Sequence, residues 1–111
     1  MIKPIPKKLL CNSVTYSKYI PDTGEGATWE TAVTLSNVKI DEQKQFKRGF
    51  NGAEIIGNAM LYYDYINSSG LTSKPTNESK IFYQDRTYCV VDTDILRENS
   101  DTPHHYEILL K

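Results

Sequence analysis

The densest run of apolar and aromatic residues lies between Phe50 and Asn67 and contains only two formal charges, Glu54 and Asp64. A period of two divides this run into two faces, and both faces hold apolar groups. That pattern is typical of a strand covered on both sides. A helix is the competing interpretation, but two glycines and the cluster of aromatic residues disfavour it. The run therefore predicts the central strand of a small β-domain.

Two further strands are predicted in the N-terminal half of the chain. Alternating apolar and polar positions over residues 12–20 indicate a half-buried strand. A similar alternation runs over residues 27–40, but its apolar phase shifts at Ser36-Asn37. Such a shift predicts a β-bulge, which would curl the strand as a small barrel requires.

The C-terminal half predicts shorter strands. Residues 80–91 form two strand-like runs around a polar dipeptide, which indicates a hairpin. Residues 68–79 have the composition of a loop. Residues 92–100 are acidic and predict irregular structure with, at most, one helical turn at 94–97. Residues 106–110 predict a closing strand.

About six strands and little helix predict an all-β fold, best described as a small antiparallel β-barrel with one long inter-strand loop. The 111 residues are expected to form one domain, 1–111. Residues 1–10 combine two prolines with three lysines, which favours an extended N-terminal arm over a helix. A frayed terminus explains the same composition equally well.

The segment 41–53 is polar, contains two glycines and separates two strong strand signals. Its central part holds three basic residues and no acidic one. We expect a long mobile loop, with a short helix from Asp41 as the alternative. Loops of this length inside compact domains are often functional. The candidate functional residues of this loop are Lys44, Phe46, Lys47, Arg48 and Phe50.

Composition narrows the classes of function. The formal net charge of -1 and the pI of about 6.1 give no global attraction to nucleic acid or anionic membranes. No apolar run reaches the length of a membrane span, and the N-terminus does not read as a signal peptide. Two cysteines, Cys11 and Cys89, are too few for a disulfide scaffold, so we expect reduced, partly buried thiols.

No catalytic constellation stands out in the sequence. His104 and His105 are adjacent, so on a strand they should point to opposite faces and not chelate one metal. No phosphate-binding loop or serine elbow is present. We therefore expect no enzyme, no cofactor and no metal. The alternative function is a single-stranded nucleic-acid-binding barrel, in which Tyr63 and Tyr65 would stack bases.

Several short motifs occur in a fixed order along nearly the whole chain. They are Ile5-Pro6-Lys7-Lys8-Leu9-Leu10, Ser13-Val14-Thr15-Tyr16, Asn51-Gly52-Ala53-Glu54-Ile55, Leu61-Tyr62-Tyr63-Asp64 with Asn67-Ser68, and Pro103-His104-His105-Tyr106-Glu107. Together they resemble the small minor capsid proteins of tailed phages and prophages of Gram-positive bacteria. One departure is the dipeptide Gln84-Asp85, where an Asn-Gly type of hairpin turn is expected.

The resemblance implies a head–tail connector component of the head-completion or stopper type. Such a protein is a small β-barrel that forms a ring below the portal and adaptor, closes the channel and docks the tail. The implied partners are the portal or adaptor, tail-side connector proteins and further copies of the chain, which is expected to be a monomer when isolated. The implied location is the neck of the virion, after assembly from the host cytoplasm, with no membrane contact.

The resemblance also assigns a role to the segment 41–53. In similar connector proteins the corresponding loop points inward and helps close the channel on DNA. Basic side chains of this loop would then attract phosphates without sequence preference, and Phe46 and Phe50 would pack loop against loop to form the plug. The alternative is an ordinary solvent-exposed loop with Phe46 or Phe50 packed on its own barrel.

Overall fold

The computed structural model describes residues 6–21, 24, 26–49, 52–97 and 103–111. Over these residues the chain is all-β, apart from one short 3-10 turn near its start. The elements are η1 (Lys7–Leu9), β1 (Asn12–Ser17), β2 (Tyr19–Ile20), β3 (Thr28–Trp29), β4 (Val33–Asp41), β5 (Gln45–Gly49), β6 (Gly52–Gly57), β7 (Ala59–Asp64), β8 (Lys80–Tyr83), β9 (Arg86–Arg97) and β10 (Pro103–Leu110).

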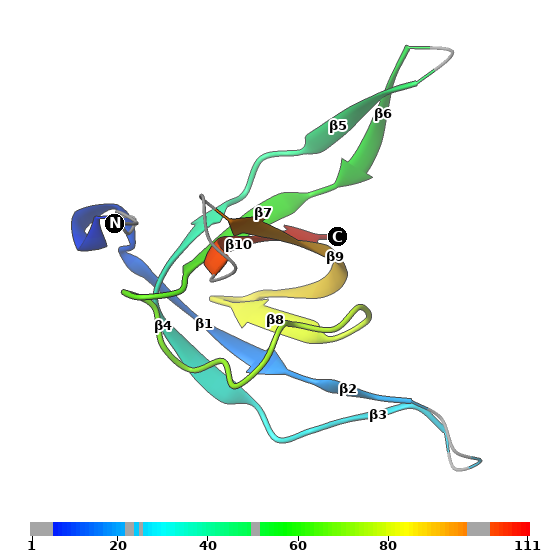
Figure 1. Cartoon of the computed structure of the whole chain (residues 1–111). Coiled ribbons are helices and arrows are strands. Elements are labelled where there is room, and N and C mark those ends of the chain that lie inside the picture. Colours follow the sequence, from blue (N-terminus) through cyan, green and yellow to red (C-terminus); the bar gives the residue numbers. More distant parts are fainter. Residues whose placement is uncertain (1–5, 22–23, 25, 50–51, 98–102) are drawn as a thin grey trace.

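Six strands close into a barrel in the order β1-β4-β7-β10-β9-β8 (Figure 1). Every neighbouring pair in this barrel is antiparallel. The predicted all-β fold and six-stranded antiparallel barrel are therefore confirmed. Closure leaves the barrel sheet without an open edge, so contacts with other molecules must use its faces, loops or projecting hairpins.

The core lies inside the barrel and is built from alternate side chains of its strands. Leu35, Leu61 and Ile108 come from three different strands and are all 0% exposed. Tyr63 and Tyr106 stack with their ring centroids 6.0 Å apart. The buried core residues are Val14, Tyr16, Leu35, Val38, Ile40, Ala59, Leu61, Tyr63, Ile81, Tyr88, Val90, Tyr106, Ile108 and Leu110.

A bulge in β4 keeps two stretches of that strand facing the core. Val14 pairs with Leu35 whereas Asn12 pairs with Val38, so β4 holds one more residue than β1 over this stretch. Asn37 takes up the extra residue with a φ of 56°, in the left-handed region that asparagine tolerates. The phase shift predicted from the sequence at this point is confirmed.

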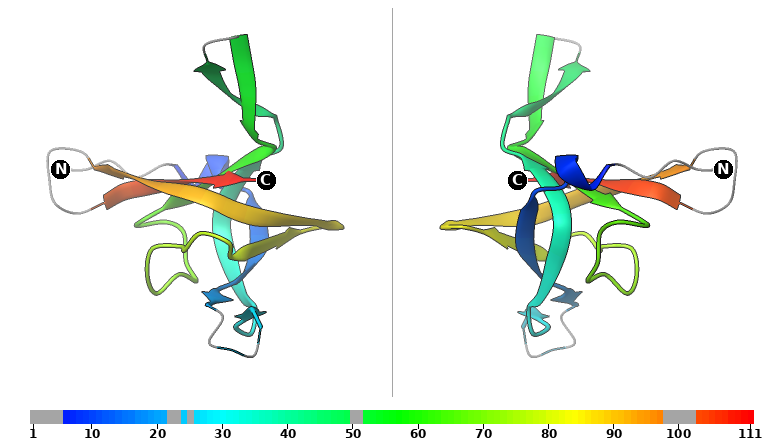
Figure 2. Two further views of the ribbon diagram at one scale, coloured as in Figure 1. Left: turned by 90° about the vertical axis from the view of Figure 1, so that its right-hand side faces the viewer. Right: turned by 90° about the vertical axis from the view of Figure 1, so that its left-hand side faces the viewer.

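Two hairpins leave the barrel at opposite ends (Figure 1, Figure 2). One is the β5–β6 arm, residues 45–57, which continues outward from the paired strands β4 and β7. The other is the β2–β3 arm, residues 19–29, which continues outward from β1 and β4. Each arm is therefore an extension of a barrel ladder, so the barrel fixes its root.

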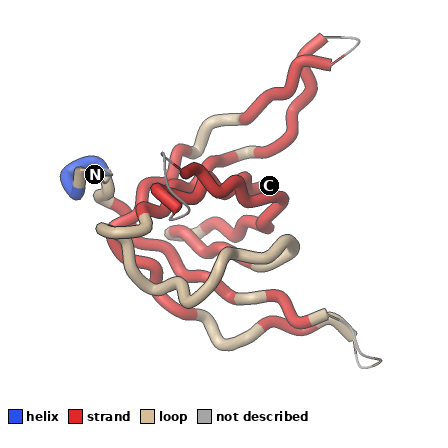
Figure 3. Tube along the Cα trace, in the orientation of Figure 1, coloured by secondary structure: helices blue, strands red, loops and turns tan. Residues whose placement is uncertain are grey.

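The prediction of one long loop over residues 41–53 is wrong. β4 runs to Asp41, and residues 45–49 form β5, which pairs antiparallel with β6. Figure 3 shows a short connection, residues 42–44, with strand β4 before it and strand β5 after it. Backbone pairing between β5 and β6 satisfies amides that a polar loop would leave to water. Composition alone does not reveal such a partner.

The central strand predicted between residues 50 and 67 is divided in two. Asn58 separates β6 from β7, and its amide donates to the carbonyl oxygen of Leu110 at 2.7 Å. The preceding Gly57 lies so close to β10 that an added Cβ would stand 2.6 Å from Leu109 Cδ1. The glycine therefore permits the close approach at which the arm leaves the barrel.

The predicted hairpin over residues 80–91 is confirmed. Tyr83 pairs with Arg86, so Gln84 and Asp85 form a two-residue turn between β8 and β9. Gln84 has a φ of 52°. A residue other than glycine or asparagine thus adopts the positive φ that such turns require.

The irregular structure predicted for residues 92–100 is wrong as far as Arg97. β9 continues to that residue because it pairs with β10 from Val90 to Arg97. Thr93 faces the interior and is 4% exposed, so the acidic side chains around it occupy the outer face. Residues 98–102 lie outside the described residues. The predicted closing strand is confirmed and begins at Pro103.

The segment that follows β7 runs along the outside of the barrel without forming a strand, as its composition predicted. The buried carboxylate of Asp64 starts it by accepting hydrogen bonds from the amides of Ile66 and Asn67, at 3.0 and 2.7 Å. Ser69 then exchanges two backbone hydrogen bonds with Ser36, at 3.0 and 3.1 Å. The loop is thereby attached to the bulge of β4.

The N-terminal segment and the cysteines also differ from expectation. Residues 7–9 form a 3-10 turn rather than extended backbone, and Leu10 is buried at 2% exposure. Residues 1–5 of the predicted arm lie outside the described residues. Cys11 and Cys89 are both free and exposed, so their predicted partial burial is wrong.

Candidate functional site

The β5–β6 arm exposes an apolar pair. Phe46 on β5 and Ile55 on β6 are Cα partners in the antiparallel ladder, and their side chains are 59% and 49% exposed. Directly opposed side chains on one face of a hairpin contact each other. A two-stranded hairpin in water is nevertheless only marginally stable. The pair is therefore a surface that burial against another molecule would stabilise.

The sequence contains a pattern that predicts this arm, although the polar composition of residues 41–53 favours a loop. Phe46 stands three residues before Gly49, and Ile55 stands three residues after Gly52. The structure pairs the two glycines, and Gly52 has a φ of 108°. Apolar residues placed symmetrically about a glycine-bounded turn are a hairpin pattern. Ile55 is the arm residue that the sequence-based list of site residues missed.

The structure distributes the predicted site residues along this arm. Lys44 is exposed and precedes β5, while Phe46 is exposed within β5. Lys47 and Arg48 belong to the outer half of the same strand. Phe50 lies outside the described residues. The arm, residues 45–57, together with Lys44 carries three basic residues and one acidic residue.

A charged cluster holds the root of the arm against the barrel. Arg86 of β9 forms an ion pair with Glu42 at 3.2 Å, and the hydroxyl of Tyr88 donates to the same carboxylate oxygen. Burial raises the pKa of Tyr88, and the carboxylate of Glu42 raises it further. The cluster joins the connection between β4 and β5 to β9.

The aromatic platform predicted for nucleic-acid binding is not formed. Tyr63 is 5% exposed and stacks on Tyr106 inside the barrel, whereas Tyr65 follows β7 and is 51% exposed. Single-strand binders stack successive bases on exposed aromatic rings. Because Tyr63 is occupied by core packing, the two tyrosines do not provide such a surface together.

The adjacent histidines are closer than strand alternation predicts. His104 Nδ1 lies 2.7 Å from His105 Nδ1, and the two rings meet edge to face with centroids 5.0 Å apart. His105 Nε2 lies 3.0 Å from Glu107 Oε2. The expectation that the two side chains point to opposite faces is therefore wrong. A register shift between Pro103 and His105 accounts for the difference.

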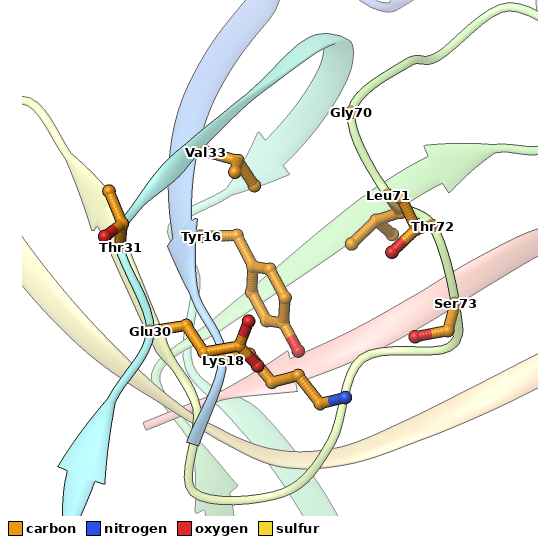
Figure 4. A pocket seen from close by; sticks show the side chains of 9 residues that line it. All are labelled: Tyr16, Lys18, Glu30, Thr31, Val33, Gly70, Leu71, Thr72 and Ser73. Carbon is orange, nitrogen blue, oxygen red and sulfur yellow. The ribbon is translucent and has the colours of Figure 1, made fainter. Parts of the chain in front are cut away.

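A hollow lies at the base of the β2–β3 arm (Figure 4). Its volume is about 100 Å³, below the range of roughly 300–1,000 Å³ that small-molecule sites occupy. The Tyr16 hydroxyl in it donates to Ser79 Oγ at 3.3 Å and accepts from the Thr76 amide at 3.2 Å. This tyrosine therefore has a structural role, joining β1 to the segment before β8.

The described residues contain no group of three or more His, Cys, Asp and Glu side chains arranged to hold a metal ion. They also contain no helix that is long and apolar enough to cross a membrane. The β5–β6 arm, with its exposed apolar pair, is the candidate functional feature.

The comparisons with known proteins place the chain. A family model described as minor capsid protein matches residues 6–110. The chain belongs to the minor capsid protein family. The comparisons with curated proteins and with solved structures gave no match.

Membership of the minor capsid protein family gives the chain a structural role in the virion. The resemblance of its short motifs to phage minor capsid proteins is confirmed at this level. A minor capsid protein acts through its contacts with other virion components. The exposed surfaces of its barrel and arms are therefore the parts of this chain that require explanation.

Proposed function

We propose that this minor capsid protein is a head–tail connector subunit of the head-completion or stopper type, from a phage or prophage of a Gram-positive host. It closes the portal channel in the neck of the virion and docks the tail. The observation that carries the proposal is the β5–β6 arm, a hairpin that projects from the barrel and exposes the apolar pair Phe46 and Ile55. Its partners are the portal or adaptor on one side and tail-side connector proteins on the other.

The shape of the molecule suits a ring of identical subunits. A ring requires each subunit to present different surfaces to its two neighbours. The two arms leave this barrel at opposite ends and differ in size, so the molecule has two unlike ends (Figure 2). In a ring, arms from neighbouring subunits meet and cover the apolar pair Phe46 and Ile55. The apolar pair of each copy is covered only when a neighbouring arm meets it in the ring. We therefore expect the chain to be a monomer before the ring assembles.

The basic residues of the arm suit a position beside packaged DNA. Lys44 precedes β5, and Lys47 and Arg48 belong to β5. Each phosphate contact is weak and independent of sequence, but a ring presents many copies at once. The arm therefore combines an apolar pair for contact between subunits with positive charge for contact with DNA.

Removal of the arm tests the proposal. Residues 45–56 are replaced by Asn-Gly, which favours a tight hairpin turn. The replacement keeps Glu42 with its Arg86 contact, and it keeps Gly57 and Asn58, which pack against β10. The barrel should remain folded, since the closure entropy of a loop changes slowly with its length. Heads carrying this variant should lose packaged DNA.

Two point variants separate the arm's contributions. Phe46→Ser with Ile55→Ser keeps the charges but removes the apolar pair, and should reduce ring formation. Exchange of Lys44, Lys47 and Arg48 for Gln keeps the pair and should weaken DNA retention most at high salt. The matched control exchanges Lys18 and Lys74, which lie outside the arm, for Gln. Normal DNA retention by heads with the shortened arm would contradict the channel role.

A further inference from the structure

A hollow lies at the root of the β5–β6 arm, where parts of the barrel that are far apart in the sequence meet. The connection between β4 and β5, the start of β9 and the residue after β10 all line it. Its volume is about 450 Å³, within the range of roughly 300–1,000 Å³ that small-molecule sites occupy. This hollow is therefore large enough to hold a ligand.

Most residues that line the hollow are exposed and carry hydrogen-bond donors. They are Lys44, Asn58, Arg86, Thr87 and Lys111. Lysine and arginine side chains only donate, and the asparagine amide and the threonine hydroxyl can also donate. In the described part of the chain, Arg86 alone among the five has a polar partner for its side chain. The other donors are thus available to a ligand.

The negative groups beside the hollow are already engaged. Glu42 Oε2 lies 3.2 Å from Arg86 Nη1 and also accepts from the hydroxyl of Tyr88. The carboxyl group of Lys111 is attached to β9, because its oxygen accepts from the Cys89 amide at 3.0 Å. The Arg86 side chain is 67% exposed, so its contact with Glu42 leaves further N–H groups for a ligand.

The charge and the donors of the hollow favour an oxyanion. Three cationic side chains line it, together with one acidic side chain, which the ion pair neutralises. Asp85, in the turn before Arg86, is not among the lining residues. Arginine binds phosphate through paired N–H groups, and lysine binds it as a point charge. A phosphate group therefore matches the hollow better than a cation or an apolar ligand does.

The position of the hollow indicates the source of the phosphate. Lys44 lines the hollow and also begins the basic run that continues along β5 with Lys47 and Arg48. A polyanion that lies along the arm would therefore reach the barrel at this hollow. Duplex DNA carries one negative charge for about every 1.7 Å of its axis. A duplex in contact with the arm thus offers further phosphates at the root.

We propose that the hollow binds a backbone phosphate of duplex DNA. Lys44, Arg86 and Lys111 supply the positive charge, and the side chains of Asn58 and Thr87 supply neutral donors. The contact is independent of sequence, because it reads no base. The inference rests on the proposed function for the presence of DNA beside the arm, but the site itself lies outside residues 45–56.

The test titrates a short DNA duplex into the full chain between about 50 and 200 mM salt. ¹H–¹⁵N spectra should show shifts of the Asn58 side-chain amide and of the Thr87 backbone amide. Lys111→Gln should weaken binding about tenfold at the lowest salt and reduce the slope of log K against log [salt] by about 0.9, as the loss of one phosphate contact does. Lys74→Gln is the matched control, since it removes the same charge from an exposed residue that does not line the hollow. It should change both quantities clearly less.

A shortened arm separates this site from the role proposed for the arm. Replacement of residues 45–56 by Asn-Gly keeps every residue that lines the hollow. The shortened chain should still bind the duplex, though more weakly than the full chain, and Lys111→Gln should weaken that binding further. Heads that retain DNA with the shortened arm would contradict the arm's role in the channel and leave this binding unchanged.

Three results would overturn the phosphate site. The first is an equal effect of Lys111→Gln and Lys74→Gln on duplex binding by the full chain, which decides the matter even if the shortened chain does not fold. The second is no duplex binding at the lowest salt. Inorganic phosphate is the second probe, and shifts of Asn58 and Thr87 with phosphate ions but not with the duplex would assign the hollow to a free anion and not to DNA.

Discussion

Gly70 is the position where one added methyl group should have the largest effect on the barrel. Its φ is 119°, in a region that favours glycine, and an added Cβ would lie 2.3 Å from the carbonyl oxygen of Thr34 and 2.8 Å from Leu35 Cδ2. The first of these atoms belongs to the backbone of β4 and cannot rotate away. Gly70→Ala must therefore displace the loop from β4 and weaken the backbone bridge between Ser36 and Ser69.

The free energy of unfolding that Gly70→Ala loses has two parts. Backbone strain at such a φ costs about 1–3 kcal/mol. Overpacking against fixed neighbours costs about 1–3 kcal/mol more. The sum of about 2–6 kcal/mol is a large share of the roughly 5–15 kcal/mol by which domains are usually stable. Gly24 supplies the control, because its φ is 112° but nothing in the described part of the chain lies within 4 Å of an added Cβ.

Urea unfolding followed by circular dichroism measures both variants. Gly24→Ala should lose only the strain, whereas Gly70→Ala should lose clearly more free energy of unfolding. If Gly70→Ala does not fold at all while Gly24→Ala does, Gly70→Ala is again the less stable variant, as expected. Equal losses in the two variants would refute the reasoning, because close packing would then contribute nothing.

Two further predictions concern the root of the β2–β3 arm and the barrel tyrosines. Trp29 Nε1 donates to the Glu78 carbonyl at 2.9 Å, and Lys80 Nζ lies 3.8 Å from the centroid of the Trp29 ring. Trp29→Ala should therefore lower the free energy of unfolding, measured in urea, by about 1–3 kcal/mol. Trp29→Phe keeps a ring without the N–H and should cost less; an equal cost would show that the ring contributes nothing. Burial raises the pKa of Tyr62 and Tyr106 above the ordinary value of about 10. The folded state then holds these protons more tightly, so the contribution of these two groups to stability should be fully present below pH about 10 and be lost as the pH rises further. Tyr106→Phe should flatten that fall, and an unchanged pH profile would contradict the assignment.

Local patterns in the sequence determined much of the barrel. Alternation with a period of two predicted strands over residues 12–20 and 27–40, which the structure divides into β1 and β2 and into β3 and β4. The phase shift at residue 36 predicted the bulge of β4. The hairpin over residues 80–91 followed from two strand-like runs around a polar dipeptide. These features are readable because each depends on neighbours in the chain and on one buried face.

The tertiary structure decided how the strands pair. The polar segment before Gly49 became strand β5 because β6 supplied its hydrogen-bonding partner, and the acidic end of β9 remained strand because β10 did. His104 and His105 met because β10 is one residue longer than its partner at that point. Strand register is set between segments far apart in the chain, and a shift of one residue moves a side chain to the other face. Alternation within a single segment carries no information about that shift.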